Sequence, residues 1–346
     1  MPQTFTDILE KISRSENLSA EEGEFALQQI VDGEISNEQV AAFLFGMRMK
    51  GETVKELTAF VKVMREAAIR VDVEQNGAVD LCGTGGDGSG TFNISTTAMF
   101  VVAGSGVPVL KHGNRSISSK CGSADVLELL GARANLQKKE IENVFSETGM
   151  AFMFAPNFHP AMKYVMPARR SLKMRTFFNM LGPLLNPAGV KRQVIGTFSP
   201  DSAKMMIQIL SNLKSEKAFT VSAKDGMDEI SLVERTTVFE LKKDRSVDSK
   251  LFDPQTLGFE MVNAGDLKGG DTAVNAEILK SVLKGKSDSA KQNIVILNSA
   301  FAILASGKSE NLHESVKMAS DSILSGRAYD KLEQFITATN DLVNSQ

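Results

Sequence analysis

A glycine-rich segment contains the residues best suited to bind an anion. It runs from Asp80 to Thr97, reads DLCGTGGDGSGTFNISTT and holds five glycines. Glycine lets backbone N–H groups approach an anion closely, and a helix that starts after such a loop adds unpaired N–H donors and the positive end of its dipole. The segment therefore predicts a loop that binds phosphate. Asp87 within it would repel phosphate, so we expect its carboxylate to face a ribose, an amine or metal-bound water.

Two familiar phosphate motifs do not explain this loop. Gly83, Gly85 and Gly88 match the spacing of a dinucleotide-binding loop, but that fold needs an acidic residue about 20 positions further on, at the end of the next strand. The next predicted strand instead leads into Lys111 and His112, which suit an anion. No Gly-Lys-Ser or Gly-Lys-Thr closes the run, so it is not a P-loop.

A basic segment, KHGNRSISSKCGSAD from Lys111 to Asp125, follows that next predicted strand. Ligands bind at the carboxyl ends of parallel strands, so we expect this segment and the glycine-rich loop to face one pocket. Lys111, Arg115 and Lys120 supply positive charge, while serines and the backbone supply neutral donors. Ser123 is expected to cap the next helix. The alternative is a solvated basic loop followed by a helix cap.

A pair of acids follows a later predicted strand, within Asp225-Gly-Met-Asp-Glu229. Adjacent carboxylates repel each other unless a cation lies beside them, so Asp228 and Glu229 at a strand end indicate magnesium. The alternative is a solvated turn around Gly226. The phosphate-binding loops favour the metal site, because a bound phosphate gives the ion something to bridge.

A cluster of cations occupies Ala168 to Thr176, ARRSLKMRT. For Arg170, Lys173 and Arg175 we expect a charged helix face in solvent. One arginine of the cluster is a candidate to enter the pocket and bind a carboxylate.

The elements that position these residues fall into a helical group and an α/β group. Residues 1–72 are predicted to be helical, and residues 73–346 alternate apolar strands with helices, which is typical of an α/β domain with a largely parallel sheet flanked by helices. The segment 171–189 interrupts that order and is expected to return to the helical domain. Capping boxes are expected in the helical domain at Ser19 with Glu22, Ser36 with Gln39 and Thr53 with Glu56. Strands are predicted at 78–81, 107–110, 151–154, 193–198, 218–222 and 237–241, and helices near 95–104, 123–131, 201–214, 272–285, 288–306 and 311–340.

The composition excludes several classes of function. Lys and Arg total 39 against 42 for Asp and Glu in 346 residues, so no overall basic field points to nucleic acid or an anionic membrane. We see no secretory signal and no apolar run of bilayer length, and therefore expect a cytoplasmic protein. Cys82 and Cys121 are expected to be reduced core residues, and the histidines at 112, 159 and 313 do not have the spacing of zinc ligands.

Taken together, these segments resemble the anthranilate phosphoribosyltransferase family along essentially the whole chain. The matching motifs are DLCGTGGD, KHGNRSISSKCGSAD, RTFFNMLGPLLNP and the Asp228-Glu229 pair. The resemblance implies a fold of the nucleoside phosphorylase and phosphoribosyltransferase type, with two Mg²⁺ per monomer and a homodimer joined through the helical domain. It implies transfer of the phosphoribosyl group of 5-phosphoribosyl 1-pyrophosphate to the amine of anthranilate, the second step of tryptophan biosynthesis from chorismate.

The resemblance also implies a role for individual residues. Those expected to bind phosphoribosyl pyrophosphate are Gly83, Gly86, Asp87, Thr91, Asn93, Ile94, Ser95, Thr96, Lys111, His112, Gly113, Asn114, Arg115, Ser116, Ile117, Ser118, Ser119 and Ser123. Those expected to hold metal are Ser95, Asp228 and Glu229, and those expected to contact anthranilate are Gly83, Asn114 and Arg169. Lys111, Asp228 and Glu229 are the expected catalytic residues.

One residue has an open role, and two others depart from the family pattern. His112 is open to two interpretations, a general base or a residue that packs against substrate. Lys173 stands where the family pattern has a glycine, and Leu185 replaces a frequent threonine. Neither departure removes an expected ligand.

Two alternatives compete with this interpretation. A pyrimidine nucleoside phosphorylase shares the helical and α/β architecture and a glycine-rich loop, but the unbroken Lys111 to Arg115 motif and the Asp228-Glu229 pair disfavour it. A non-catalytic relative that binds nucleic acid would show a strongly basic surface and no acidic metal ligands, and this sequence has neither feature.

Overall fold

A bundle of helices opens the chain in the computed structural model, which describes residues 4–116 and 121–341. Its helices are α1 (Phe5–Ser13), α2 (Ala20–Val31), α3 (Asn37–Lys50) and α4 (Val54–Glu66). The capping boxes predicted at Ser19 and Thr53 are confirmed, because each hydroxyl accepts a backbone N–H and the following glutamate returns a bond. The box predicted at Ser36 is wrong, since Ser36 accepts the Gln39 N–H without the reciprocal bond. A fourth cap, a full box at Thr4, was not predicted.

A seven-stranded sheet forms the centre of the rest of the chain. Its strands, in chain order, are β1 (Val79–Gly83), β2 (Val109–Gly113), β3 (Met150–Phe154), β4 (Arg192–Gly196), β5 (Lys217–Ala223), β6 (Thr236–Leu241) and β7 (Val247–Phe252). The spatial order is β3-β2-β1-β4-β5-β6-β7; β1 to β5 are parallel, and β6 and β7 are antiparallel. The predicted largely parallel sheet is therefore confirmed. Strand β7 was not predicted because most of its residues are exposed and it lacks apolar alternation.

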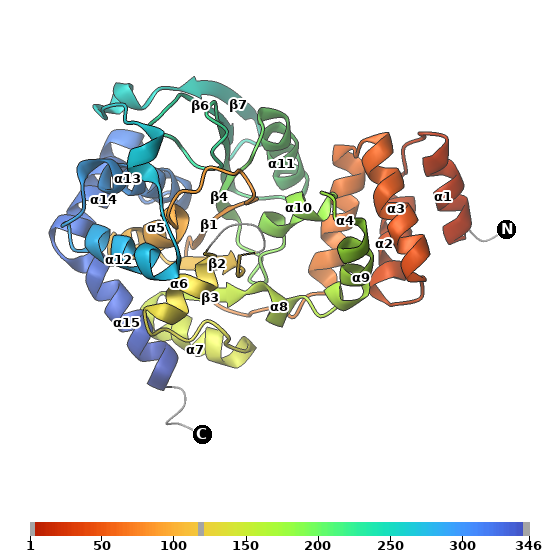
Figure 1. Cartoon of the computed structure of the whole chain (residues 1–346), viewed down its shortest axis with the longest axis horizontal. Helices are drawn as coiled ribbons and strands as arrows, with labels where there is room; N and C mark the ends of the chain where they lie inside the picture. Colours follow the sequence, from red (N-terminus) through yellow and green to blue (C-terminus); the bar gives the residue numbers. More distant parts are fainter. Residues whose placement is uncertain (1–3, 117–120, 342–346) are drawn as a thin grey trace.

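Helices cover the sheet and connect its strands (Figure 1). They are α5 (Ile94–Gly104), α6 (Ser123–Leu129), α7 (Lys138–Thr148), α8 (Ala155–Phe158), α11 (Pro200–Asn212), α12 (Thr272–Leu283), α13 (Ser289–Ser306), α14 (Leu312–Leu324) and α15 (Arg327–Asp341), with 3₁₀ turns at Gly182–Leu184, Pro254–Leu257 and Ala264–Leu267. The single helix predicted at 311–340 is wrong. It is divided at Gly326, whose φ of +82° lies in the left-handed region that favours glycine.

The segment between β3 and β4 packs against the helical bundle. Helix α9 (Met162–Leu172) lies beside α2 and α3, and α10 (Phe178–Leu181) follows it (Figure 1). The rings of Phe60 on α4 and Phe177 lie 4.7 Å apart between centroids, within one apolar cluster. This packing starts with α9, earlier than the predicted segment 171–189, because Val165 and Ala168 already face the bundle core. The boundary between residues 72 and 73 stays a prediction.

Within the residues that the structure describes, no helix is both long enough and apolar enough to span a membrane.

Candidate active site at the carboxyl edge of the sheet

The glycine-rich loop and the acidic turn meet where β1, β4 and β5 end. Gly83 at the end of β1 pairs with Gly196 at the end of β4, and the Thr84 N–H donates to the Gly196 carbonyl at 2.9 Å. The Gly85 N–H donates to Asp228 Oδ2 at 2.7 Å, and the Asp228 N–H donates to Asp87 Oδ2 at 3.3 Å. Segments more than a hundred residues apart therefore form one site, as parallel-sheet topology predicts.

Two glycines make room for the acidic turn. A Cβ at Gly196 would overlap the backbone carbonyl of Asp228, and a Cβ at Gly83 would overlap its carboxylate. Gly83 belonged to the predicted site, but Gly196 did not. Sequence reasoning missed Gly196 because it ends an ordinary apolar strand outside any glycine-rich run, and no local signal shows what lies opposite it.

The acids at this edge are electrostatically strained. Burial raises the pKa of Glu229 well above its usual range, and the neighbouring Asp228 raises it further. Burial and the nearby Asp87 carboxylate raise the pKa of Asp228 in the same way, while the Gly85 N–H opposes the shift. The Lys111 ammonium and the Ser95 N–H lower the pKa of Glu229, but they do not offset its burial. A cation at this edge would favour the charged form of both acids.

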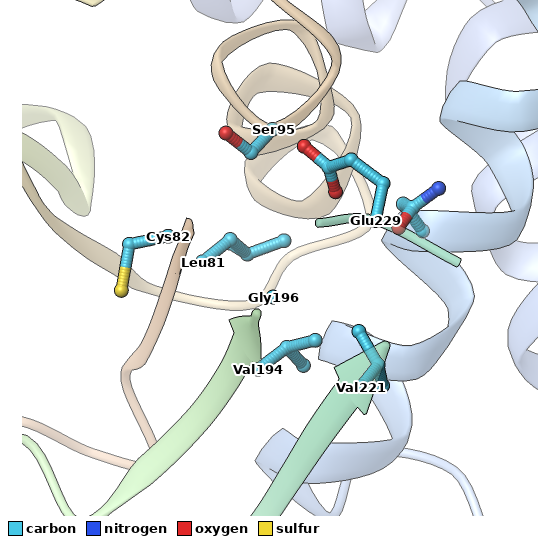
Figure 2. A pocket seen from close by; sticks show the side chains of 8 residues that line it. Leu81, Cys82, Ser95, Val194, Gly196, Val221 and Glu229 are labelled. Atoms are coloured by element: carbon cyan, nitrogen blue, oxygen red, sulfur yellow. The ribbon is translucent and has the colours of Figure 1, made fainter. Parts of the chain in front are cut away.

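A cavity of about 10 Å³ lies beside Glu229, large enough for about one water molecule. Figure 2 shows the oxygens of Ser95 and Glu229 on the same side of this cavity, above the ends of β4 and β5. Among the described residues, no three His, Cys, Asp or Glu side chains form a preformed metal cage. The donor set nevertheless fits a hard divalent cation of the Mg²⁺ type, which keeps several waters and takes one or two carboxylates together with ligand phosphates.

Lys111 is buried in this edge, with 1% of its surface exposed. Its ammonium donates to the Leu81 carbonyl and to Ser95 Oγ, the latter at 3.2 Å. The prediction that the strand ends before Lys111 is wrong, because Lys111 and His112 lie inside β2. A buried lysine is tolerated in a strand only where acceptors or acids face it, and here those partners come from β1 and from the start of α5.

One such acid, Asp80, was not in the predicted site. Its carboxylate accepts the His112 N–H at 3.2 Å and the Asn186 side-chain amide at 2.8 Å. Burial raises the pKa of Asp80, and the charge of Lys111 opposes that rise. An acid between apolar strand residues, Val79 and Leu81, was the available signal for this buried network.

The start of α5 is open toward the site. Asn93 is its N-cap residue, and its side chain makes no capping bond. The Ile94 N–H donates to the Phe92 carbonyl at 2.7 Å and the Ser95 N–H donates to Glu229, so an anion would meet the Thr96 N–H and the positive end of the helix dipole. The Asn93 amide instead donates to the Cys121 carbonyl at 3.3 Å and accepts from the Asn275 amide at 3.1 Å. Thr96 donates to Ser123 Oγ at 2.8 Å, which joins the glycine-rich loop to the basic segment.

Residues far along the chain support the glycine-rich loop. Lys268 forms a β-bridge with Thr91, and its ammonium donates to the Ser89 carbonyl. Asn275 accepts the Gly270 N–H at 2.8 Å while it holds Asn93. Neither Lys268 nor Asn275 could be placed here from sequence, because only the tertiary fold brings residues 267–275 to this loop.

The basic segment is described only in part, since Ile117, Ser118, Ser119 and Lys120 lie outside the described residues. Arg115 is bound to α6, through Asp125 at 3.0 Å and Glu128 at 2.6 Å. The Asn114 carbonyl accepts the Ala124 N–H at 3.3 Å. The predicted cap at Ser123 is wrong: Gly122 is the N-cap of α6 and Ser123 is its first residue, so the Ser123 hydroxyl faces Thr96 instead.

His112 is paired with a second histidine. Its Nε2 lies 3.3 Å from the Nε2 of His159, and both rings are buried. Burial lowers the pKa of His112 to about 3 and that of His159 to about 4. An effective general base has a pKa near the working pH, so this geometry favours packing over proton transfer for His112.

Arg169 projects from α9 as a half-buried cation. Its guanidinium lies 5.6 Å from the centre of the Phe178 ring, and burial lowers its pKa. It makes no ion pair with any carboxylate of the described residues, so it is suited to a carboxylate ligand. Lys173 ends α9 with a φ of +48°, the left-handed conformation that explains the glycine of the family pattern.

Arg170, Lys173 and Arg175 are exposed, as predicted, but only Arg170 lies on a helix face, because α9 ends at Leu172. Arg175 also reaches the site, because its guanidinium donates to the Gly86 carbonyl and lies 4.9 Å from the centre of the Phe198 ring. The contact ties the segment after α9 to the glycine-rich loop.

Two family models match the chain. The helical bundle domain of a glycosyl transferase family matches residues 6–68, and the a/b domain of that family matches residues 75–329. An anthranilate phosphoribosyltransferase of Pelotomaculum thermopropionicum is 46% identical, with 96% of each chain covered. One of Salinibacter ruber is 43% identical and covers 96% of this chain and 98% of its own.

Solved structures give the same result. The anthranilate phosphoribosyltransferase of Thermus thermophilus superposes with a TM-score of 0.89 at 36% identity, covering 96% of this chain and 98% of its own. The Saccharomyces cerevisiae enzyme in complex with PRPP and Mg superposes with a TM-score of 0.89 at 26% identity, covering 99% of both chains. The yeast enzyme in complex with 4-fluoroanthranilate gives a TM-score of 0.88 at 26% identity, with 97% of this chain and 98% of its own covered. The chain therefore belongs to the anthranilate phosphoribosyltransferase family, a family of glycosyltransferases in tryptophan biosynthesis.

Proposed function

We propose that the carboxyl edge of the sheet carries out the reaction of this family. The chain transfers the phosphoribosyl group of 5-phosphoribosyl 1-pyrophosphate to the amine of anthranilate, giving N-(5-phosphoribosyl)anthranilate and pyrophosphate. The observation that carries the residue assignment is the meeting of the buried Asp228 and Glu229 with the glycine-rich loop and the open start of α5.

The donor's phosphates bind between the glycine-rich loop and α5 in this proposal. Backbone N–H groups of the loop and the helix start supply donors, and the buried Lys111 supplies a fixed positive charge. The proposed donor-binding residues within the described chain are Gly83, Gly86, Asp87, Thr91, Asn93, Ile94, Ser95, Thr96, Lys111, His112, Gly113, Asn114, Arg115, Ser116 and Ser123. Ile117, Ser118 and Ser119 complete the proposed set and lie outside the described residues.

The proposed cofactor is Mg²⁺, held by Ser95, Asp228 and Glu229 and supported by the yeast structure with PRPP and Mg. We propose two ions per monomer. When bound, Mg²⁺ neutralises charge on the departing pyrophosphate. Before it arrives, the raised pKa values of the two acids keep a proton at this edge, and the Gly85 N–H holds Asp228 in place.

The proposed anthranilate site combines Arg169, Asn114 and Gly83. The guanidinium of Arg169 has no acid partner in the described chain and would bind the substrate carboxylate. The yeast complex with 4-fluoroanthranilate supports a site for this type of molecule on the same fold. The amine of anthranilate is neutral and aromatic, so it needs orientation more than a base.

The chemistry at C1 of the ribose is a displacement by that amine as pyrophosphate departs. No covalent protein nucleophile is needed, and the positions of the two substrates supply much of the rate. Lys111, held by the Leu81 carbonyl and Ser95, adds positive charge that does not reorganise during the reaction. Lys111, Asp228 and Glu229 are thus the proposed catalytic residues.

We also propose a homodimer joined through the helical domain, residues 1–72, with residues 73–346 as the α/β domain. Helix α3 buries Phe43 and Leu44, yet it also exposes Phe45 and Met49 one turn apart, at 47% and 71% of their surfaces. Apolar side chains on the outer face of a helix favour a protein partner. A cytoplasmic location is proposed for this biosynthetic enzyme, in which neither Cys82 nor Cys121 forms a disulfide within the described residues.

The test follows anthranilate fluorescence with phosphoribosyl pyrophosphate and Mg²⁺, with and without EDTA. We expect consumption that EDTA abolishes.

Arg169→Ala should raise the anthranilate KM about tenfold or more, because a charge-assisted pair is lost, and should change the donor KM little. The exposed neighbour Arg170→Ala is the matched control. Equal effects on both KM values would show that Arg169 is structural, and no consumption in any condition would refute the activity.

A further inference from the structure

A second polar pocket lies at the opposite, amino edge of the sheet. It has a volume of about 290 Å³ and is lined by residues from the end of α4, the segment before β1 and the segment before β4. Arg65 comes from α4, Arg70 precedes β1, and Lys191 precedes β4. The carboxyl edge holds the proposed reaction, so this pocket belongs to neither of its substrate sites.

The pocket carries more positive charge than its acids balance. Arg65, Arg70 and Lys191 form no salt bridge with a carboxylate in residues 4–116 or 121–341. The one acid in the lining, Asp72, is paired outward with Lys138. Like charges in one pocket repel, and the charge of Arg65 contributes, after burial, to the lowered pKa of Lys191.

One donor in the pocket lacks a partner. The Nε of Arg65 donates to the Leu184 carbonyl at 2.7 Å, but its Nη2 is buried and has no hydrogen-bond partner among the described residues. A buried guanidinium nitrogen without an acceptor is costly, and proteins usually satisfy such a group with water or a ligand. The acceptor that fits a guanidinium fork is a planar or tetrahedral oxyanion.

We propose that this pocket binds a small oxyanion, a phosphate or a carboxylate, between Arg65 and Lys191. The apolar part of the lining, Val71, Leu185 and Pro187, has room for a small body attached to the charged head. The site joins the two parts of the fold, because Arg65 belongs to the bundle and Lys191 immediately precedes β4 of the sheet.

The pocket also has a direct connection to the catalytic edge. Asn186 lines the pocket, and its amide donates to Asp80 and to the Leu110 carbonyl, each at 2.8 Å. Leu110 immediately precedes Lys111 in β2. A bound oxyanion would therefore be separated by Asn186 from Asp80 and from the strand residue that precedes Lys111.

The test measures thermal unfolding of the full chain with inorganic phosphate and, in a second arm, acetate, without Mg²⁺ and at constant ionic strength. A ligand that binds the native state raises Tm saturably. Lys191→Gln should weaken phosphate binding about tenfold, because a charge-assisted contact is lost. Without phosphate it should unfold at about the same temperature, since its repulsion with Arg65 and its attraction to Glu216 are both lost. Arg70→Gln, at the exposed rim, provides a second variant if Lys191→Gln does not fold.

Two controls separate this pocket from other anion sites. Lys214→Gln removes an exposed charge near Lys191 that does not line the pocket, and should keep the full phosphate effect. Ser123→Ala weakens the proposed donor site, so the Lys191→Gln loss must persist in that background.

A Tm gain in the acetate arm assigns a carboxylate ligand, and a gain with phosphate alone assigns a phosphate. No saturable gain with either probe, or the same gain in Lys191→Gln and wild type, overturns the proposal; neither readout depends on enzyme activity.

Discussion

In the helical bundle, polar groups find partners within the bundle, whereas at the carboxyl edge they find them across the whole fold. The buried Glu56 accepts the N–H groups of Thr53 and Leu18 and pairs with Lys50 at 2.9 Å, all within the bundle. Asp228 instead accepts a bond from Gly85, 143 residues away, and lies against another carboxylate, Asp87. Partners within the bundle stabilise the charge of the first acid, but the second acid faces a like charge.

The bundle is therefore built for stability, and the carboxyl edge is built to bind a ligand. Capping boxes and apolar faces stabilise the bundle without any ligand. The carboxyl edge buries acids whose pKa values are raised, which lowers the stability of the charged form until a cation or substrate arrives. Substitutions in the two regions should therefore change stability and activity in different ways.

The largest expected loss of stability comes from filling the space beside Asp228. Gly196→Ala would place a methyl group on the Asp228 carbonyl, so the acidic turn must move. We expect a stability loss of about 2 kcal/mol and a fall in turnover of about a hundredfold. Gly265→Ala, where a Cβ meets no atom, is the matched control and should change stability by less than about 0.5 kcal/mol. Urea unfolding and the fluorescence assay measure both; normal turnover in Gly196→Ala would contradict the account.

A second prediction concerns pH. Because the folded pKa of Glu229 is raised, the native state keeps its proton longer than the unfolded chain, and stability without metal is lost as pH rises through the folded value. Glu229→Gln removes this loss, so at pH 8 without Mg²⁺ it should be more stable than wild type by about 1 kcal/mol or more, though inactive. Chemical denaturation at pH 5 and pH 8 measures the difference. The exposed Glu234→Gln is the control, and an unchanged pH profile in Glu229→Gln would refute the electrostatic account.

The smallest expected effects are stability losses from two helix-cap substitutions within the bundle. Thr53→Ala removes the hydroxyl that orients Glu56 in a full capping box, and should cost about 1–2 kcal/mol. Ser36→Ala removes a single exposed bond of 3.4 Å and should cost about 0.5 kcal/mol. Neither variant should change kcat. Equal losses in urea unfolding would show that the reciprocal bond does not matter.

The sequence predicted those features that local chemistry determines. Caps at Ser19 and Thr53, the parallel sheet and the union of the glycine-rich loop with Asp228 all followed from residue types and strand order. Gly196, Asn275 and Lys268 could not be predicted, because each matters through a partner far away in sequence. Lys111 was found as a cation but placed after its strand, since burial of a lysine depends on acceptors that the strand alone does not show.

The proposed reaction requires Asp228 and Glu229 to act through a divalent cation at the carboxyl edge. Titration of turnover with Mg²⁺ in wild type and in the Asp228→Asn, Glu229→Gln double variant tests it most directly, with circular dichroism to confirm the fold. We predict a turnover lower by about 10²–10³-fold and a Mg²⁺ dependence shifted to higher concentration. A double variant with the wild-type Mg²⁺ titration would contradict the account.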